Sequence, residues 1–159
     1  MRHSEQPPAF IYRHIVCLEE TNLFSTVYFA RHVAWQGACR EMFLRAHAPG
    51  TLRQFSTGLR LVTVRLSCEY INEVYAFEEV ELRMSLSDVI DNRILLRFDY
   101  RILRDGAWLQ IAQGDQEIRS MIQIGETLAP CPIPSDLAAA LNAYRVDSLT
   151  SPHLEGSNP

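Results

Sequence analysis

The chain of 159 residues has no lysine, so all 15 of its Lys-or-Arg cations are arginines. A catalytic lysine or a lysine Schiff base is therefore excluded. The formal net charge is −4, which argues against nucleic-acid binding driven by a basic field. With 47% hydrophobic and 21% charged residues, the chain has the composition of a folded globular protein, and its length suits one domain.

The sequence also lacks the cysteine and apolar patterns of metalloproteins, secreted proteins and membrane proteins. Its four cysteines form no Cys-x-x-Cys pair and have no matching pair of histidines, which argues against a zinc site or a disulfide framework (Cys17, Cys39, Cys68 and Cys131). We expect reduced thiols and no metal or organic cofactor. Residues 1–8 contain no apolar run typical of a signal peptide, and no segment is long enough to cross a membrane. We therefore expect a cytoplasmic protein without a membrane partner.

The first third of the chain predicts one strand and one long helix. Phe10–Leu18 is rich in aromatic and β-branched residues, as strands are. A helix is expected from about 27 to 46, apolar around most of its circumference, with Ser25 or Thr26 as its N-cap. Pro49-Gly50 should end this helix.

Over residues 59–124 the pattern changes to the period of two that is typical of half-buried strands. One face is expected to carry the apolar side chains of three successive strands (Val62, Val64, Leu66, Cys68 and Tyr70; Val80, Leu82, Met84 and Leu86; Ile94, Leu96, Phe98, Tyr100 and Ile102). Asp91-Asn92 and Asp105-Gly106 suit two-residue hairpin turns between strands. In the last strand, 107–124, the apolar set shifts from odd to even positions, which predicts a bulge near Gly114.

These elements combine into one α+β architecture. A sheet with one polar face and a helix that is apolar nearly all round are both satisfied when about five antiparallel strands wrap the helix, which is the hot-dog fold. A short helix capped by Ser135 should reach Tyr144. We expect a single domain over residues 1–147 and a disordered tail over 148–159. Exposed sheet edges favour a homodimer or homotetramer formed by edge pairing.

Arg40 is the residue of the long helix that least fits its surroundings. At about 100° per residue it falls within about 20° of Phe29 and Val33, and Gln36 is its only polar companion on that side. It can be a structural arginine that snorkels to solvent or pairs with a carboxylate. A charge on the apolar side of a core helix also suits a functional site, and the helical wheel alone leaves both interpretations open.

Asn22 lies in the polar turn before the helix, where an asparagine ordinarily serves as a turn residue or a cap. The N–H groups around Val27 and Tyr28 form the positive end of the helix dipole and could polarise a carbonyl. An asparagine beside them could hold a water molecule or a substrate carbonyl, although it could not act as a base. A catalytic role for Asn22 therefore depends on the helix start beside it.

A resemblance to a known family favours the functional interpretation of both residues. The match is dense from Glu19 to Leu44, while over the remaining chain only the strand pattern agrees. The residues that carry it are Glu20-Thr21-Asn22-Leu23, Val27-Tyr28-Phe29, Trp35-Gln36-Gly37 and Cys39-Arg40-Glu41-Met42-Phe43-Leu44. With these motifs the chain resembles the hot-dog thioesterases of enediyne polyketide biosynthesis, which are relatives of the 4-hydroxybenzoyl-CoA thioesterases.

The resemblance implies hydrolysis of the thioester that joins a polyene or β-keto polyketide chain to the acyl carrier protein of an iterative polyketide synthase. Asn22 would position the attacking water or the thioester carbonyl, and Arg40 would stabilise the oxyanion or grip a β-keto or carboxylate group. We then expect both side chains at the mouth of one channel. The helix start and its neighbours would bind the oxyanion and the substrate (Thr26, Val27, Tyr28 and Gln36). The chain departs from the family at Phe24-Ser25-Thr26, where a small residue, glycine and asparagine are usual, so its acyl entrance should differ.

Other charged residues allow weaker functional interpretations. One face of a predicted strand carries Arg93, Arg97 and Arg101, which can form an ordinary solvated face or a docking stripe for the acidic carrier protein. His14 and His32 could serve as the base of a hot-dog dehydratase, but a structural role is the simpler interpretation of each.

Two other functions stay open at this point. The chain could hydrolyse acyl-CoA or aroyl-CoA thioesters, or it could be a non-catalytic hot-dog module that binds a synthase. The altered turn before the helix keeps the second alternative open, and rates on matched CoA and carrier-protein substrates would separate the enzymes.

Overall fold

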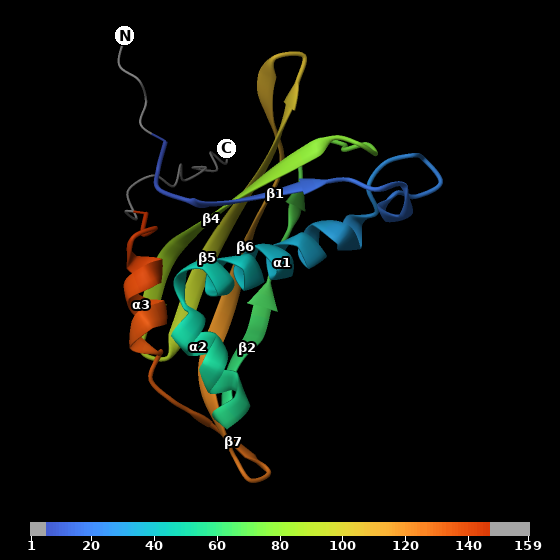
Figure 1. Ribbon diagram of the computed structural model, residues 1–159. Helices are drawn as coiled ribbons and strands as arrows, with labels where there is room; N and C mark the ends of the chain where they lie inside the picture. The colour runs from blue at the N-terminus through green and yellow to red at the C-terminus, as the bar shows by residue number, and fades with distance from the viewer. Residues whose placement is uncertain (1–5, 147–159) are drawn as a thin grey trace, which may run out of the picture.

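The computed structural model describes residues 6–146 and shows one long helix, α1 (Phe29–His47), lying against one face of an antiparallel sheet (Figure 1). The strand order is β1-β4-β5-β6-β2, and two short strands, β3 and β7, also pair with β6. The strands are β1 (Phe10–Ile15), β2 (Leu59–Leu66), β3 (Glu69–Tyr70), β4 (Glu79–Ile90), β5 (Arg93–Arg104), β6 (Ala107–Ile124) and β7 (Thr127–Pro130). This arrangement confirms the predicted α+β hot-dog fold. None of the helices in the described range is long and apolar enough to span a membrane.

The start of α1 differs from the prediction. The helix begins at Phe29 instead of near residue 27, and its N-cap makes no side-chain capping bond. An isolated β-bridge joins Thr21 to Val27, so the chain stays extended up to the helix. Ser25 adopts a left-handed conformation (φ 64°) in the turn that this bridge closes. Ser25 and Thr26 are therefore turn residues, and the prediction that one of them caps the helix was wrong.

The other helix boundaries agree with the sequence more closely. α1 ends at His47, just before the predicted stop at Pro49-Gly50, but the same proline opens a second helix, α2 (Pro49–Gln54), that the pattern did not indicate. α3 (Ser135–Asn142) follows Pro134 as its N-cap and is shorter than predicted.

The core forms between α1 and the inner face of β4 and β5. Every apolar residue predicted for that face on these two strands is buried (Val80, Leu82, Met84, Leu86, Ile94, Leu96, Phe98, Tyr100 and Ile102). They pack in one cluster with Trp35, Cys39 and Phe43 of α1. The connecting turns carry Asp91 (φ 54°) and Asp105 (φ 53°) in left-handed conformations, as two-residue hairpins require. The period-two pattern therefore gave the correct inner face here.

The bulge in β6 lies three residues before its predicted position. Tyr100 pairs with Ala112 and Arg101 pairs with Gln110, so Ile111 is the extra residue. Ile111 and Ala112 are both fully buried, which is the point where the inward set changes from odd to even positions.

Gly114 is required for a different reason, since a side chain there has no room. A Cβ atom at this position would overlap the Ser67 carbonyl oxygen and lie 2.6 Å from Gln36 Nε2. We expect Gly114→Ala to lower the free energy of unfolding by about 1–3 kcal/mol, measured by urea titration. Gly37→Ala is the matched control, because a Cβ at Gly37 meets nothing within 4 Å and should stabilise α1 by about 0.5–1 kcal/mol. Unchanged stability in Gly114→Ala would contradict this account of the glycine.

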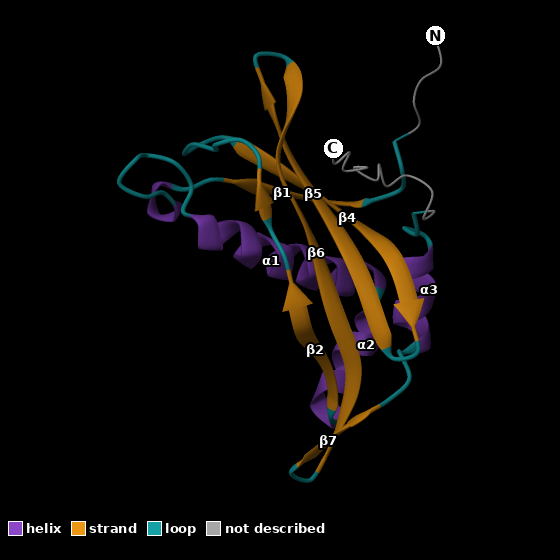
Figure 2. Cartoon of the chain, turned by 180° about the vertical axis from the view of Figure 1, so that it is seen from behind, coloured by secondary structure: helices purple, strands orange, loops and turns teal. Residues whose placement is uncertain are grey.

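β2 is the one long strand whose burial was predicted wrongly. Figure 2 shows it at one edge of the sheet, hydrogen-bonded on one side to β6. Its register shifts between Thr63 and Arg65, and Val64 and Leu66 are 44% and 41% exposed instead of buried. The apolar residues at the end of β2 thus lie exposed on an edge strand, and packing within the core does not explain why they are apolar.

Candidate functional site

Asn22 lies in a tight turn directly before α1. The Asn22 N–H donates to the Thr26 carbonyl (2.8 Å), and Asn22 Oδ1 accepts from Phe24 N–H (2.8 Å) and Thr26 Oγ1 (3.3 Å). The side chain therefore performs the turn role expected of a lone asparagine. Within residues 6–146, none of the hydrogen bonds uses its Nδ2 group, which stays available to a ligand.

Two apolar residues of this turn, Leu23 and the departing Phe24, point away from the protein body. Leu23 is fully exposed and Phe24 is 84% exposed, so neither side chain fills a cavity of the protomer. The bulkier turn consequently does not block the acyl entrance from within one protomer.

The N–H groups predicted as oxyanion donors are already occupied. Val27 N–H donates to the Val74 carbonyl and Tyr28 N–H donates to the Glu20 carbonyl, both at 2.8 Å. Because α1 begins two residues later than predicted, the helical N–H groups without a partner in the described range are those of Phe29 and Ala30. These two groups, at the positive end of the helix dipole, replace the predicted pair.

A cavity of about 280 Å³ lies at this helix start. Thr26, Val27, Phe29 and His32 line one side of it, and the segment 70–74 lines the other. Two of the predicted binding residues, Thr26 and Val27, therefore do border a cavity, although Val27 contributes no free amide.

Arg40 projects from α1 toward the sheet and has no carboxylate partner among the ion pairs of the described residues. Its Nη1 donates to Thr63 Oγ1 (2.8 Å) and to Gln116 Oε1 (3.2 Å). Burial lowers the pKa of Arg40, and the nearby Glu41 carboxylate partly offsets this effect. Arginine stays protonated nonetheless. Arg40 is therefore not paired with a carboxylate in the described range, and its hydrogen-bond partners are neutral, which leaves its charge able to bind an anion or oxyanion.

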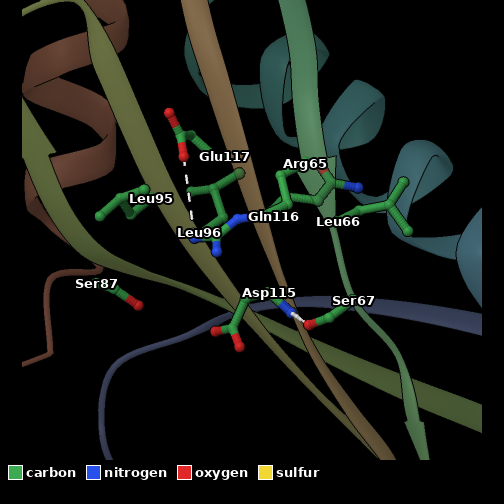
Figure 3. Close-up of a pocket in the computed structure, with 9 residues that line it drawn as sticks. All are labelled: Arg65, Leu66, Ser67, Ser87, Leu95, Leu96, Asp115, Gln116 and Glu117. Atoms are coloured by element: carbon green, nitrogen blue, oxygen red, sulfur yellow. Dashed lines mark hydrogen bonds and ion pairs between the residues drawn. The ribbon is translucent and has the colours of Figure 1, made fainter.

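A chain of amide groups fixes the position of Arg40. Gln116 Nε2 donates to Gln36 Oε1, and Gln36 Nε2 donates to the Ser67 carbonyl, both at 3.0 Å. Gln36 is fully buried, so in this structure it contributes to the series of amide hydrogen bonds and is not open to a substrate. Gln116 and Ser67 also border a cleft of about 260 Å³ in the sheet, where Asp115 N–H donates to Ser67 Oγ at 3.0 Å (Figure 3).

Arg40 and Asn22 do not open onto one channel within a protomer, contrary to expectation. Arg40 lines a separate cavity of about 380 Å³ whose apolar wall includes Leu44, Phe55 and Leu59. Arg40 follows the first helical residue by 11 positions, which is about 16 Å along the helix axis. Within one protomer, Arg40 and the helix start therefore border different cavities.

Glu20 is a site residue that the sequence reasoning missed. It is 6% exposed and accepts hydrogen bonds from Cys17 N–H (2.8 Å), Trp35 Nε1 (2.9 Å) and His14 Nε2 (2.7 Å). Burial alone would raise the pKa of Glu20, but the hydrogen bonds from Cys17, His14 and Trp35 lower it below the ordinary value. The capping-box spacing of Cys17 and Glu20 was the available signal. Through this contact His14 has a structural partner, and the carboxylate ties the Asn22 turn to α1.

Each arginine of the predicted stripe has a carboxylate partner. Arg93, Arg97 and Arg101 do share the outer face of β5, but each lies within ion-pair distance of an acid: Arg93 with Glu117 (3.6 Å), Arg97 with Asp99 (3.4 Å) and Arg101 with Glu81 (2.7 Å). Two of these acids are shared, since Glu81 also lies within ion-pair distance of Arg13 and Arg83, and Glu117 of Arg65 and Arg119. Carrier-protein docking at this face stays a prediction.

A long helix held by an antiparallel sheet is the hot-dog fold. The chain belongs to the thioesterase-like superfamily, whose family model matches residues 16–141. It is 41% identical to the dynemicin thioesterase, known from crystal structures with bound polyene, over 88% of this chain and 99% of that one, with a TM-score of 0.85.

More distant structures share the fold alone. They include a 1,4-dihydroxy-2-naphthoyl-CoA thioesterase from Synechocystis (16% identity, 84% of this chain, 96% of that one, TM-score 0.72). A 4-hydroxybenzoyl-CoA thioesterase from a Pseudomonas species is 13% identical over 84% of this chain and 99% of that one, with a TM-score of 0.70. No curated protein sequence is significantly similar to the chain.

Proposed function

We propose that this thioesterase hydrolyses the thioester between a polyene or β-keto acyl chain and the acyl carrier protein of an iterative polyketide synthase. The observation that carries the proposal is the pair of free N–H groups of Phe29 and Ala30 at the start of α1. The turn that precedes them in the chain holds Asn22, whose carboxamide nitrogen is unused among the described residues. The similarity to the dynemicin thioesterase, whose crystal structures concern polyene binding, supports this class of acyl chain.

The helix start can stabilise the charge that develops during hydrolysis. A thioester carbonyl oxygen that accepts hydrogen bonds from the Phe29 and Ala30 N–H groups would carry its negative charge at the positive end of α1. The Asn22 Nδ2 group can hold the attacking water, whose oxygen bonds to the carbonyl carbon. The C–S bond then breaks, the acid is released, and the proton lost by the water goes to the departing thiolate. A thiol is a good leaving group because its pKa is about 8.5, so no strong base is needed.

The site is completed by a second copy of the chain. β2 runs from Leu59, at the Arg40 cavity, to Leu66, and the chain then reaches Tyr70 at the helix-start cavity. When two β2 edges pair antiparallel about a two-fold axis, the beginning of each strand lies beside the end of the other. Each Arg40 cavity then adjoins the helix-start cavity of the partner. The exposed apolar side chains of β2 would be covered by the same contact.

Two substrates with the same acyl chain test whether the acyl carrier is a carrier protein or CoA. We expect kcat/KM for an acyl-carrier-protein thioester to exceed that for the CoA thioester of the same acyl chain at least about tenfold, because protein contacts add transition-state binding. Asn22→Ala protein gives the background rate. Equal rates, or a preference for CoA, would replace the carrier protein with CoA as the partner. Tight binding of the loaded carrier protein without any hydrolysis would favour the non-catalytic module.

A further inference from the structure

Tyr70 makes a hydrogen bond to the first turn of α1 that the helix itself does not require. The Tyr70 hydroxyl donates to the Phe29 carbonyl at 2.8 Å. In an α-helix this carbonyl already accepts from the N–H group four residues further on, here that of Val33. The bonding needs of the helix therefore do not explain why a tyrosine from another part of the chain reaches this carbonyl.

The carbonyl that Tyr70 contacts belongs to the same peptide group as one of the free donors. The carbonyl of one residue and the N–H of the next form a single planar unit, so the Phe29 carbonyl and the Ala30 N–H are two ends of one peptide. The Ala30 N–H has no partner among the described residues and is one of the two groups proposed to bind the oxyanion. Tyr70 thus holds one end of this peptide, and the thioester oxygen would be bound at the other end.

The neighbours of Tyr70 fix its ring beside the helix start. Tyr70 is the last residue of β3 and pairs with the fully buried Ala112 of β6. Its ring packs edge-on against the ring of His32, with centroids 5.0 Å apart and planes at 84°. Tyr70 and Phe29 line the same cavity. A donor that is fixed in advance needs no reorganisation when charge develops on a substrate.

Tyr70 remains a hydrogen-bond donor at neutral pH. Partial burial and the neighbouring Cys68 raise the pKa of Tyr70 to about 12, so the hydroxyl keeps its proton. Donation to a peptide carbonyl polarises the peptide and strengthens the hydrogen bond that its N–H makes, by roughly 10–30% per bond.

We propose that Tyr70 is a positioning residue that orients and polarises the peptide between Phe29 and Ala30, so that the Ala30 N–H binds the oxyanion more strongly. Tyr70 touches none of the reacting atoms and acts through this peptide alone. The inference rests on the proposed thioesterase function.

The kinetic test is Tyr70→Phe, which removes the hydroxyl and keeps the ring. We expect kcat for the acyl-carrier-protein thioester to fall about five- to tenfold with KM nearly unchanged, because the lost interaction strengthens only as the oxyanion forms. Tyr75→Phe is the matched control. Tyr75 is 41% exposed against 46% for Tyr70, and its hydroxyl donates to the Glu73 carboxylate at 2.9 Å instead of to α1.

A spectroscopic test follows the peptide itself. The chain contains a single Phe-Ala pair, Phe29-Ala30. Protein labelled with carbonyl-¹³C phenylalanine and ¹⁵N alanine therefore gives one NMR cross-peak that correlates this carbonyl with this N–H. Tyr70→Phe should move the carbonyl signal to lower frequency, because the carbonyl loses a hydrogen bond, and should shift the Ala30 amide with it. Tyr75→Phe should leave the peak in place.

The outcomes separate the inference from the function on which it rests. An unchanged kcat in Tyr70→Phe would overturn the inference and leave the thioesterase proposal intact. A raised KM at unchanged kcat, or a lowered kcat with an unmoved NMR peak, would overturn it as well, because the hydroxyl would then act elsewhere. A changed molecular mass of Tyr70→Phe by light scattering would assign the hydroxyl to subunit assembly, with the same consequence. If the wild type hydrolyses neither carrier-protein nor CoA thioesters, the proposed function fails and the inference falls with it.

Discussion

Asn22→Ala and Arg40→Ala should each lower kcat/KM for the carrier-protein thioester by at least about tenfold, yet a mixture of the two inactive proteins should regain about a quarter of the wild-type activity. The reason is the proposed division of the site between two chains. Within one protomer Arg40 borders one cavity, and the helix start that follows the Asn22 turn borders another. If each complete site takes Asn22 from one chain and Arg40 from the other, half of the randomly formed dimers are mixed. Each mixed dimer has one intact site of two.

The mixing experiment requires subunit exchange, which refolding of the two variants together provides. A mixture of Asn22→Ala with the double variant Asn22→Ala, Arg40→Ala serves as the control, because no combination of these chains restores Asn22. Mixed proteins that stay inactive would show that both residues act within one protomer, against the geometry. The thermal midpoints of the single variants should lie within a few degrees of wild type, and unfolding of Arg40→Ala would identify the arginine as structural.

Glu20→Ala should be the most destabilising single substitution near the site, lowering the free energy of unfolding by about 3–5 kcal/mol. The carboxylate is buried and accepts three hydrogen bonds, so its loss leaves the Trp35 indole N–H and the Cys17 N–H unpaired. Glu19→Ala is the matched control, since this neighbouring acid is exposed and should change stability by less than about 0.5 kcal/mol. Similar urea midpoints for the two variants would contradict the structural role of Glu20.

The pH dependence of stability gives a second readout of Glu20. Its pKa is lowered in the folded protein, so its charge stabilises the fold above the ordinary carboxyl value of about 4.3, and this contribution is lost as pH falls through the folded pKa. The difference in unfolding free energy between wild type and Glu20→Gln should therefore be constant near neutral pH and shrink on acidification. A difference that does not change between pH 7 and pH 3 would show that the carboxylate charge contributes nothing.

The features that the sequence predicted correctly are those that depend on residues close together in the chain, namely the hairpin turns and the buried face of the sheet. The period of two in β4 and β5, together with the turns at Asp91 and Asp105, identified the hairpins and the inner face because both signals are local. The burial of β2 was not predictable in this way, because an edge strand keeps an apolar alternation that the protomer does not bury.

The roles of Asn22 and Arg40 stay predictions, but their arrangement differs from the expected common channel. Arg40 borders its own cavity, and its distance from the helix start follows from the length of α1, which local motifs do not indicate. The unpartnered N–H groups at the helix start are those of Phe29 and Ala30, because a bridge between Thr21 and Val27 delays the helix. This contact has no signature in the sequence pattern. The outcome shows that helical periodicity locates a charged residue on a face but does not identify its neighbours across the sheet.

The proposed pairing of two β2 edges would make turnover depend on the protein concentration. In a solitary protomer the Arg40 cavity would lack its partner cavity, and Val64 and Leu66 would stay exposed to solvent. Specific activity should then decline on dilution through the dissociation constant and recover on concentration. A cell that makes less of this chain would then lose a larger fraction of its hydrolytic activity than of its protein.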